Sequence, residues 1–229
     1  MPLSNRPAHL QTLLQSGWLA SQPEALRTRI IERIRLELFA PGATIYAVGD
    51  TPGGVYGLVS GTLAVSIAPS ASGPHVAHLA QPGSWFGEGS FLTRNPRRIG
   101  LEAVTTCILA HLPLGDMERL VGNDTEVMRA FGQIAMFNID LALSAVADLL
   151  IKDPARRVAA VLWRSSGGQS GRAIPMTQAQ LGQLANASRK HTLATLRKLV
   201  DESAIEQGYR AITILAPERL RRLADGDPD

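Results

Sequence analysis

The spacing of hydrophobic and polar residues changes along this 229-residue chain. Between Leu36 and Leu114, short runs of alternating apolar residues are separated by glycine, a pattern typical of strands joined by tight turns. The runs begin at Thr44, Gly54, Gly61, His75, Leu101 and Cys107. Strands at such regular spacing predict a small antiparallel sandwich or barrel. A helical segment around Pro23 to Leu38 is expected to precede it.

A helical pattern follows, from Asn123 to Ile151. Residues on one face recur at alternating intervals of four and three, the heptad spacing of a helix that pairs with another helix. They are Val127, Phe131, Ile134, Asn138, Leu141 and Ala145. This seam predicts a homodimer formed through residues 123–152. The alternative is that the seam packs only on its own barrel. Asp153 and Pro154 should end the helix and provide a hinge.

Two short helices joined by a tight turn are predicted between Thr177 and Val200. Thr177 is a suitable N-cap for the first helix. Its apolar face would consist of Leu181, Leu184 and Ala185. Asn186 tolerates the left-handed backbone of a sharp turn, and Ser188 can cap the second helix. This is the layout of a helix-turn-helix DNA-binding motif.

The second of these helices should be apolar on one side and basic on the other. Its core-facing stripe is expected to consist of Leu193, Leu196, Leu199 and Val200. Because first-turn residues of such a helix reach base edges, we expect Arg189 and Lys190 to donate to guanine O6 and N7. Contacts to phosphate oxygens are expected from Thr177, Gln178, Ser188 and His191. The alternative is an ordinary helical hairpin with a solvated basic face.

Charge is distributed unevenly. Residues 1–151 carry 10 lysines and arginines against 12 acidic residues, whereas residues 152–229 carry 13 against 8. The C-terminal part is therefore the one suited to a polyanion. A chain of this length suits two domains. We expect a sensor domain over 1–122, a dimerisation helix and hinge over 123–152, and a DNA-binding domain over 153–229.

Several classes of function lack sequence support. The lone cysteine, Cys107, lies in an apolar run and is expected to be a buried strand thiol, so neither an internal disulfide nor a four-cysteine cluster is possible. No catalytic constellation and no metal site is expected. The apolar stretch from Phe131 to Ile151 contains Asn138, Asp140 and Asp148, which would be costly in lipid. With no leader pattern either, we expect a cytoplasmic protein without a membrane partner.

The order of these elements resembles the CRP/FNR superfamily of transcription regulators over nearly the whole chain. The sharpest local matches are Gly61-Thr-Leu-Ala-Val, Pro82-Gly-Ser-Trp-Phe-Gly-Glu88, Ser188-Arg189, Leu196-Arg-Lys-Leu199 and the wing Arg210-Ala-Ile-Thr-Ile-Leu215. The resemblance implies an α+β fold: an antiparallel β-roll like that of cyclic-nucleotide-binding domains, a long dimerisation helix and a C-terminal winged helix-turn-helix. It also implies further phosphate contacts from Arg197, Lys198 and Arg210; the alternative for each is a solvated charge.

In members that bind cyclic nucleotides, a Gly-Glu pair and a downstream Arg-Ser/Thr-Ala hold the ligand around a short helix. The resemblance carries these roles to Gly87, Glu88 and Arg98, with Gly89 and Ser90 in the short helix and Asn138 and Ala142 at the purine. Ile99 and Gly100 replace the hydroxyl residue and alanine, so one phosphate donor is missing. The effector stays open between a cyclic nucleotide, another small molecule, a haem-type ligand and none. Glu88 and Arg98 could instead form a stabilising salt bridge.

The second helix also departs from the family. Lys190 stands where many relatives have a glutamate that accepts from cytosine, and a lysine cannot accept, so the DNA site should differ. We expect a homodimeric, sequence-specific DNA-binding transcription regulator, with double-stranded DNA, a second copy and RNA polymerase as partners. The alternative is a cyclic-nucleotide-regulated enzyme or a small-molecule-binding module that does not read DNA. A steep salt dependence of binding to duplex DNA would distinguish the two.

Overall fold

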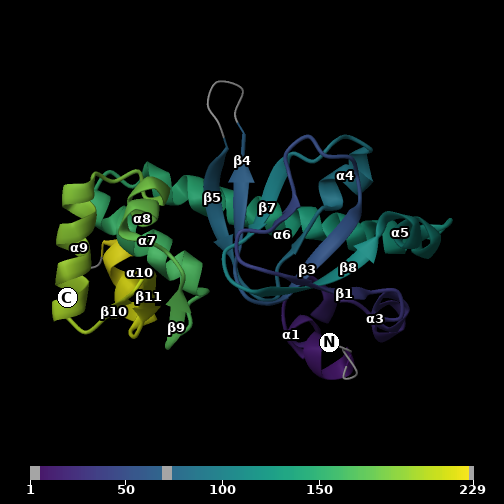
Figure 1. The fold of residues 1–229 in the computed structure, drawn as a ribbon, viewed down its shortest axis with the longest axis horizontal. Helices are drawn as coiled ribbons and strands as arrows, with labels where there is room; N and C mark the ends of the chain where they lie inside the picture. Colours follow the sequence, from purple (N-terminus) through teal and green to yellow (C-terminus); the bar gives the residue numbers. More distant parts are fainter. Residues whose placement is uncertain (1–5, 69–73, 227–229) are drawn as a thin grey trace. The chain divides into compact units, whose positions relative to one another are not determined.

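The computed structural model describes residues 6–68 and 74–226 (Figure 1). The chain divides into two compact units, Met1–Leu141 and Ala142–Asp229. The first unit begins with three helices: α1 (Arg6–Gln15), α2 (Gly17–Ala20) and α3 (Glu24–Ile31). The domain limits expected from the sequence, 1–122, 123–152 and 153–229, stay a prediction, and their outermost residues lie outside the described part.

Two four-stranded antiparallel sheets form a β-roll in this unit. One has the order β1 (Arg35–Phe39), β8 (Cys107–Pro113), β3 (Gly54–Ser60) and β6 (Trp85–Phe86). The other has the order β2 (Thr44–Tyr46), β7 (Ile99–Ala103), β4 (Leu63–Ile67) and β5 (His75–Ala80). Alternate residues of both sheets, among them Leu58, Phe86, Leu63 and Leu101, form one buried apolar cluster. The predicted β-roll is confirmed, and Cys107 is fully buried on its strand.

The helix expected around Pro23 to Leu38 is too long. It ends at Ile31, and the chain then enters β1, which pairs with β8 from Arg35 opposite His111 to Phe39 opposite Cys107. The Leu36 and Phe39 side chains are half-buried there. Pairing across the sheet therefore overrides the local helical pattern.

A second apolar cluster lies on the other side of β3 and β8, under the N-terminal helices, α5 (Leu114–Val121) and the first turns of α6 (Thr125–Leu150). The Trp18 ring lies 5.0 Å from the Trp85 ring and 5.5 Å from the Phe131 ring, centroid to centroid. Trp18 also donates its Nε1 hydrogen to the Ala130 carbonyl, 2.5 Å away. The start of α6 is thus fixed to the sensor unit by packing and by a buried hydrogen bond.

This packing covers part of the seam that was expected to form the dimer, and a role of the seam in a dimer stays a prediction. Val127, Phe131 and Ile134 are buried against the β-roll, and Asn138, Leu141 and Ala145 on the same face are half-buried. A different set recurs at intervals of three and four on the opposite face. It consists of Met136, Ile139, Leu143, Val146 and Leu150, each between 47% and 77% exposed. We call this set the exposed α6 stripe.

The second unit begins within α6, at Ala142, and α7 follows the end of that helix. Asp153 caps α7 (Pro154–Ser166) by accepting a hydrogen bond from the Ala155 amide. The unit then contains β9 (Arg172–Ile174), α8 (Gln178–Leu184), α9 (Arg189–Asp201), β10 (Ile205–Gly208), β11 (Ala211–Ile214) and α10 (Pro217–Asp225). The three strands form an antiparallel sheet in the order β10, β11, β9. Helix α7, the pair α8 and α9, and this sheet form the expected winged helix-turn-helix.

The local signals for α8 and α9 are confirmed. Thr177 forms a capping box with Gln180, and the Ser188 hydroxyl accepts from the His191 amide. Asn186 has a positive φ of 44°, as expected of the turn residue. The buried stripe of α9 differs from the expectation, however. It consists of Thr192, Thr195, Leu196 and Leu199.

Two threonines can occupy core positions because their hydroxyls are satisfied within the helix. Thr192 donates to the Ser188 carbonyl and Thr195 to the His191 carbonyl. Leu193 is consequently only half-buried, and Val200 is 38% exposed.

Two arginines of α7 connect it to neighbouring segments of the same unit. Arg157 donates to the carbonyls of Ile151 and Lys152, just after α6, and to those of Ala185 and Asn186, in the turn before α9. The Arg164 Nε lies 2.7 Å from Asp148 Oδ2, in a largely buried ion pair. The end of α6 and the helix-turn-helix turn are therefore held by the same helix.

Candidate nucleic-acid interface

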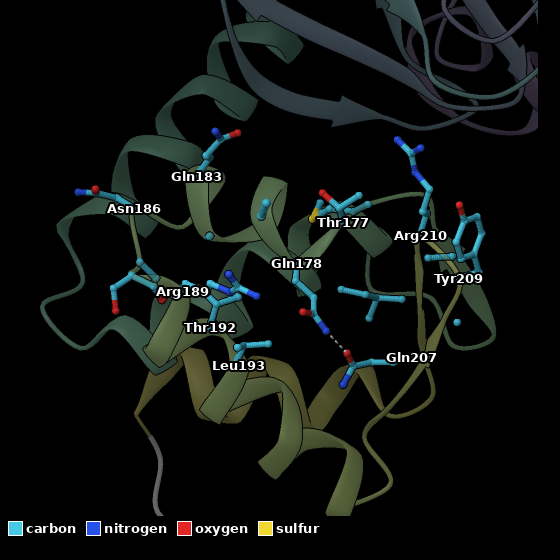
Figure 2. Close-up of a pocket in the computed structure, with 18 residues that line it drawn as sticks. Thr177, Gln178, Gln183, Asn186, Arg189, Thr192, Leu193, Gln207, Tyr209 and Arg210 are labelled. Atoms are coloured by element: carbon cyan, nitrogen blue, oxygen red, sulfur yellow. Dashed lines mark hydrogen bonds between the residues drawn. The ribbon is translucent and has the colours of Figure 1, made fainter.

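A hollow with a volume of about 1020 Å³ lies between the helix-turn-helix and the wing (Figure 2). Its walls are the N-terminal end of α8, the turn into α9, the first turns of α9, and the β10–β11 hairpin. Ten of the residues that line it have polar side chains, and the others are glycines, alanines, Met176, Leu193 and Ile212, of which Leu193 lies on α9. The hollow presents hydrogen-bond donors and acceptors from the helix-turn-helix, residues 176–193, and from the hairpin, residues 207–212.

The structure brings five of the residues predicted to contact DNA to this hollow. They are Thr177, Gln178, Ser188, Arg189 and Arg210. The remaining four, Lys190, His191, Arg197 and Lys198, are exposed on α9 outside its lining. The sequence reasoning missed Asn186, Leu193, Gln207 and Tyr209, which also line it. Gln207 and Tyr209 carry no motif, and only the position of the hairpin reveals them.

Hydrogen bonds fix the shape of the hollow. Gln178 donates from Nε2 to Gln207 Oε1 at 2.8 Å, which links α8 to the wing (Figure 2). The Ser188 hydroxyl lies 2.8 Å from His191 Nδ1. Tyr209 at the wing tip is 93% exposed, and Arg210 beside it has a positive φ of 52°. A large ring and a cation therefore project from the hairpin into solvent.

Several cationic side chains of α9 are exposed. Arg189 and Lys190 are both exposed at the start of α9. Lys198 is also exposed, and its Nζ lies 3.8 Å from Glu202 Oε1. Pairs of this kind at the surface contribute little to stability, so the lysine is available to a stronger anion.

In the sensor unit, the second predicted site centres on Glu88, at the start of α4 (Glu88–Thr93). Its side chain is buried, and Asn138 of α6 donates from Nδ2 both to Glu88 Oε1 and to the Trp85 carbonyl, each at 3.1 Å. Burial raises the pKa of the Glu88 carboxyl, while the Asn138 hydrogen bond lowers it in part. The predicted proximity of Glu88 and Asn138 is therefore present.

Arg97, rather than Arg98, lies beside this glutamate's helix. Arg98 is exposed, whereas Arg97 is 4% exposed and donates to the carbonyls of Gly87 and Gly54, each at 2.9 Å. Gly87 makes this possible, because a Cβ at its position would lie 2.5 Å from both Arg97 Nη1 and the Gly54 oxygen. The expected role of Arg98 in the pocket is thus not supported by its position. The adjacent arginine takes the buried place.

The other residues predicted to contact an effector differ in burial. Ser90 is buried, Gly89 and Ile99 are half-buried, and Ala142 is exposed on α6. A separate hollow of about 450 Å³ is bordered by Tyr46, Asp50, Tyr56 and Arg97. The Arg97 guanidinium lies 4.3 Å from the centre of the Tyr46 ring. Burial raises the pKa of the Tyr46 hydroxyl, which has no hydrogen-bond partner among the described residues.

Among residues 6–68 and 74–226, no three His, Cys, Asp or Glu side chains gather in a way that could hold a metal ion. Helix α6 is long and apolar enough to cross a membrane, by length and composition only, and 17% of its most apolar window is buried. One such helix is weak evidence for a membrane span, and the exposed α6 stripe accounts for part of its apolar character.

Comparison with known protein families agrees with this geometry. Residues 36–124 match the cyclic nucleotide-binding domain, and residues 156–223 match the Crp-like helix-turn-helix domain. The two matches cover the β-roll and the unit that contains the hollow. In the sequence, the cyclic nucleotide-binding domain comes first and the helix-turn-helix domain second.

Individual relatives show the same organisation. The chain is 23% identical over 193 residues to a CRP-like cAMP-activated global transcriptional regulator from Mycobacterium tuberculosis, covering 81% of this chain and 86% of the relative. Among solved structures, FixK2 from Bradyrhizobium japonicum matches with a TM-score of 0.69 at 20% identity, covering 83% of this chain and 96% of that one. A CRP-family transcriptional regulator from Thermus thermophilus matches with a TM-score of 0.63 at 20% identity, covering 82% and 96%.

The chain is a member of the CRP/FNR superfamily of DNA-binding transcription regulators.

Proposed function

We propose that this protein is a homodimeric regulator that binds a specific DNA sequence through the hollow between α8, α9 and the wing. The observation that best supports this proposal is that Gln178 of α8, Arg189 of α9 and Arg210 of the wing all line one hollow. A helix in the major groove reads base edges with its first residues, and Arg189 is the first residue of α9. Arg189 is assigned to a guanine and Lys190 to a neighbouring acceptor.

The phosphate contacts surround this reading position. Thr177, Gln178 and Ser188 lie at or beside the N-terminal ends of α8 and α9, where helix amides and dipoles favour anions. His191, Arg197, Lys198 and the wing residue Arg210 complete the set. Each neutralised phosphate adds to the salt dependence of binding, so affinity for any duplex should fall steeply as salt rises.

Selection of bound sequences from random duplex DNA tests this assignment. The wild-type protein should recover a motif with guanine at a fixed place in each half-site. Arg189→Ala should lose that base preference and cost about 1–3 kcal/mol on the selected site, with a smaller loss on random duplex. Recovery of no motif, together with salt-independent binding, would instead favour a sensor module that does not read DNA.

The exposed α6 stripe is the proposed dimer surface. Its five residues follow the heptad spacing and are each at least 47% exposed. A second copy of the same helix would bury a contiguous apolar stripe that is costly to leave in water. Paired copies present two reading helices, which suits two half-sites about one helical turn apart. As a DNA-binding regulator of this family, the protein is proposed to act in the cytoplasm.

The sensor pocket is proposed to be altered relative to cyclic-nucleotide-binding members. Arg97 already donates to two backbone carbonyls, Glu88 is held by Asn138, and Ile99 replaces a hydroxyl residue. Cyclic AMP and cyclic GMP should therefore bind weakly or not at all. Calorimetric titration of each nucleotide into the protein tests this; micromolar or tighter binding would contradict it.

A further inference from the structure

Helix α9 brings one apolar side chain to the proposed DNA surface. Leu193 lines the hollow together with Arg189, which lies four residues earlier and thus one turn away on the same face (Figure 2). The leucine is half-buried and is not part of the buried stripe of α9. It is therefore available to contact a ligand in the hollow.

Thr192, the neighbouring α9 residue that lines the hollow, cannot contact a ligand in the same manner. Thr192 is 1% exposed, and its hydroxyl donates to the Ser188 carbonyl at 3.1 Å. The third α9 residue there, Arg189, is a cationic donor. On the face of α9 that meets the hollow, a guanidinium and an isobutyl group therefore stand one turn apart.

The major groove contains one apolar group that distinguishes bases, the 5-methyl group of thymine. We propose that Leu193 determines sequence specificity by contacting that methyl group in each half-site. Four residues of helix span about 6 Å, and stacked bases lie about 3.4 Å apart. The thymine thus lies within about two base pairs of the base that Arg189 contacts. This inference rests on the proposed DNA-binding function.

Single replacement of thymine by uracil tests the contact, because it removes only the methyl group and leaves the protein unchanged. Each thymine of the selected duplex is replaced in turn, and the dissociation constant of the wild-type protein is measured at fixed salt. One position in each half-site should weaken binding about fourfold, the factor that corresponds to one buried methyl group. Uracil at the other positions should have little effect.

Leu193→Ala links the effect to the side chain. On the thymine duplex this variant should lose a similar factor, and it should not distinguish thymine from uracil at the sensitive position. Val200→Ala is the matched control, since Val200 is an exposed apolar residue of the same helix outside the hollow. It should keep the full thymine preference.

Two results would overturn the inference. One is a wild-type protein that tolerates uracil at every position of its site, which needs no folded variant to interpret. The other is a Leu193→Ala protein that still prefers thymine as strongly as the wild type. Either result, obtained with specific DNA binding intact, rejects the leucine contact alone. Absence of sequence-specific binding altogether would reject the proposed function.

Discussion

Replacement of Arg157 of α7 by methionine should lower the free energy needed to open the helix-turn-helix, although the residue is not part of α8 or α9. The Arg157 guanidinium makes four hydrogen bonds of 2.7 to 3.0 Å to backbone carbonyls at the ends of two helices. The carbonyls of Ile151 and Lys152 follow α6, and those of Ala185 and Asn186 follow α8. The last carbonyls of a helix have no partner within it and carry partial negative charge, so a cation there satisfies and stabilises both ends.

The size of the effect follows from these contacts. A hydrogen bond from a charged donor contributes about 1.5–3 kcal/mol, but four bonds from one half-buried group are not additive. Water also replaces part of what is lost at the exposed edge. Methionine keeps the aliphatic stem. We expect the opening free energy of the helix-turn-helix to fall by about 2–4 kcal/mol, in the range of large single-residue effects.

Hydrogen exchange of the α8 and α9 amides measures this opening in the full chain. In Arg157→Met these amides should exchange at least about 30-fold faster than in the wild type, since each 1.4 kcal/mol corresponds to a factor of ten. Arg156→Met is the matched control, because it removes the same charge from the same helix but, among the residues that the structure describes, only one hydrogen bond, from Nε to the Ala224 carbonyl. Equal exchange of α8 and α9 in the two variants would refute the reasoning.

Three further outcomes are expected. If the exposed α6 stripe is the dimer surface, Leu143→Glu should sediment as a monomer because pairing would bury the new charge. Ser144→Glu, on another face of α6, should still sediment as a dimer; a Leu143→Glu dimer would count against this surface. The pKa of Glu88 is raised by burial, so the folded state binds the carboxyl proton more tightly than the unfolded chain does. The stability that this carboxyl contributes is therefore present at acid pH and is lost as the pH rises through the folded-state pKa. Glu88→Gln should therefore raise the sensor unit's unfolding midpoint at neutral pH and match the wild type in acid; a variant less stable at neutral pH would contradict the sign. Lys198→Ala should weaken binding to all duplexes by a similar factor and reduce the salt slope by about one, unlike Arg189→Ala; a loss confined to the selected sequence would exclude a phosphate contact.

The sequence was sufficient for those features that depend on local chemistry. Capping by Thr177 and Ser188 and the left-handed backbone at Asn186 could be predicted because side-chain oxygens and backbone conformation act within a few residues. The glycine-separated strands were predictable for the same reason. β1 was not, because its half-exposed residues are defined by pairing with β8 rather than by their own pattern.

The sequence could not show which of two apolar faces of a helix packs against the rest of the protein. Helix α6 has apolar residues on opposite faces, and only the packing of Phe131 under the β-roll shows that the stripe containing Leu143 is the exposed one. Likewise, threonines that bond back to their own helix occupy the core of α9, which leaves Leu193 at the hollow. Arg97 and Arg98 differ by one position, and the contact with Gly87 distinguishes them.

The stoichiometry and half-site dependence of DNA binding test the central claim most directly. The selected duplex and a duplex of equal length with one half-site scrambled are each titrated with the protein at the same salt concentration, and the mass of every complex is measured. Two copies should bind the intact duplex, with a large loss of affinity on the scrambled one, because both reading helices must engage their bases. A single copy that binds both duplexes equally well would contradict the account.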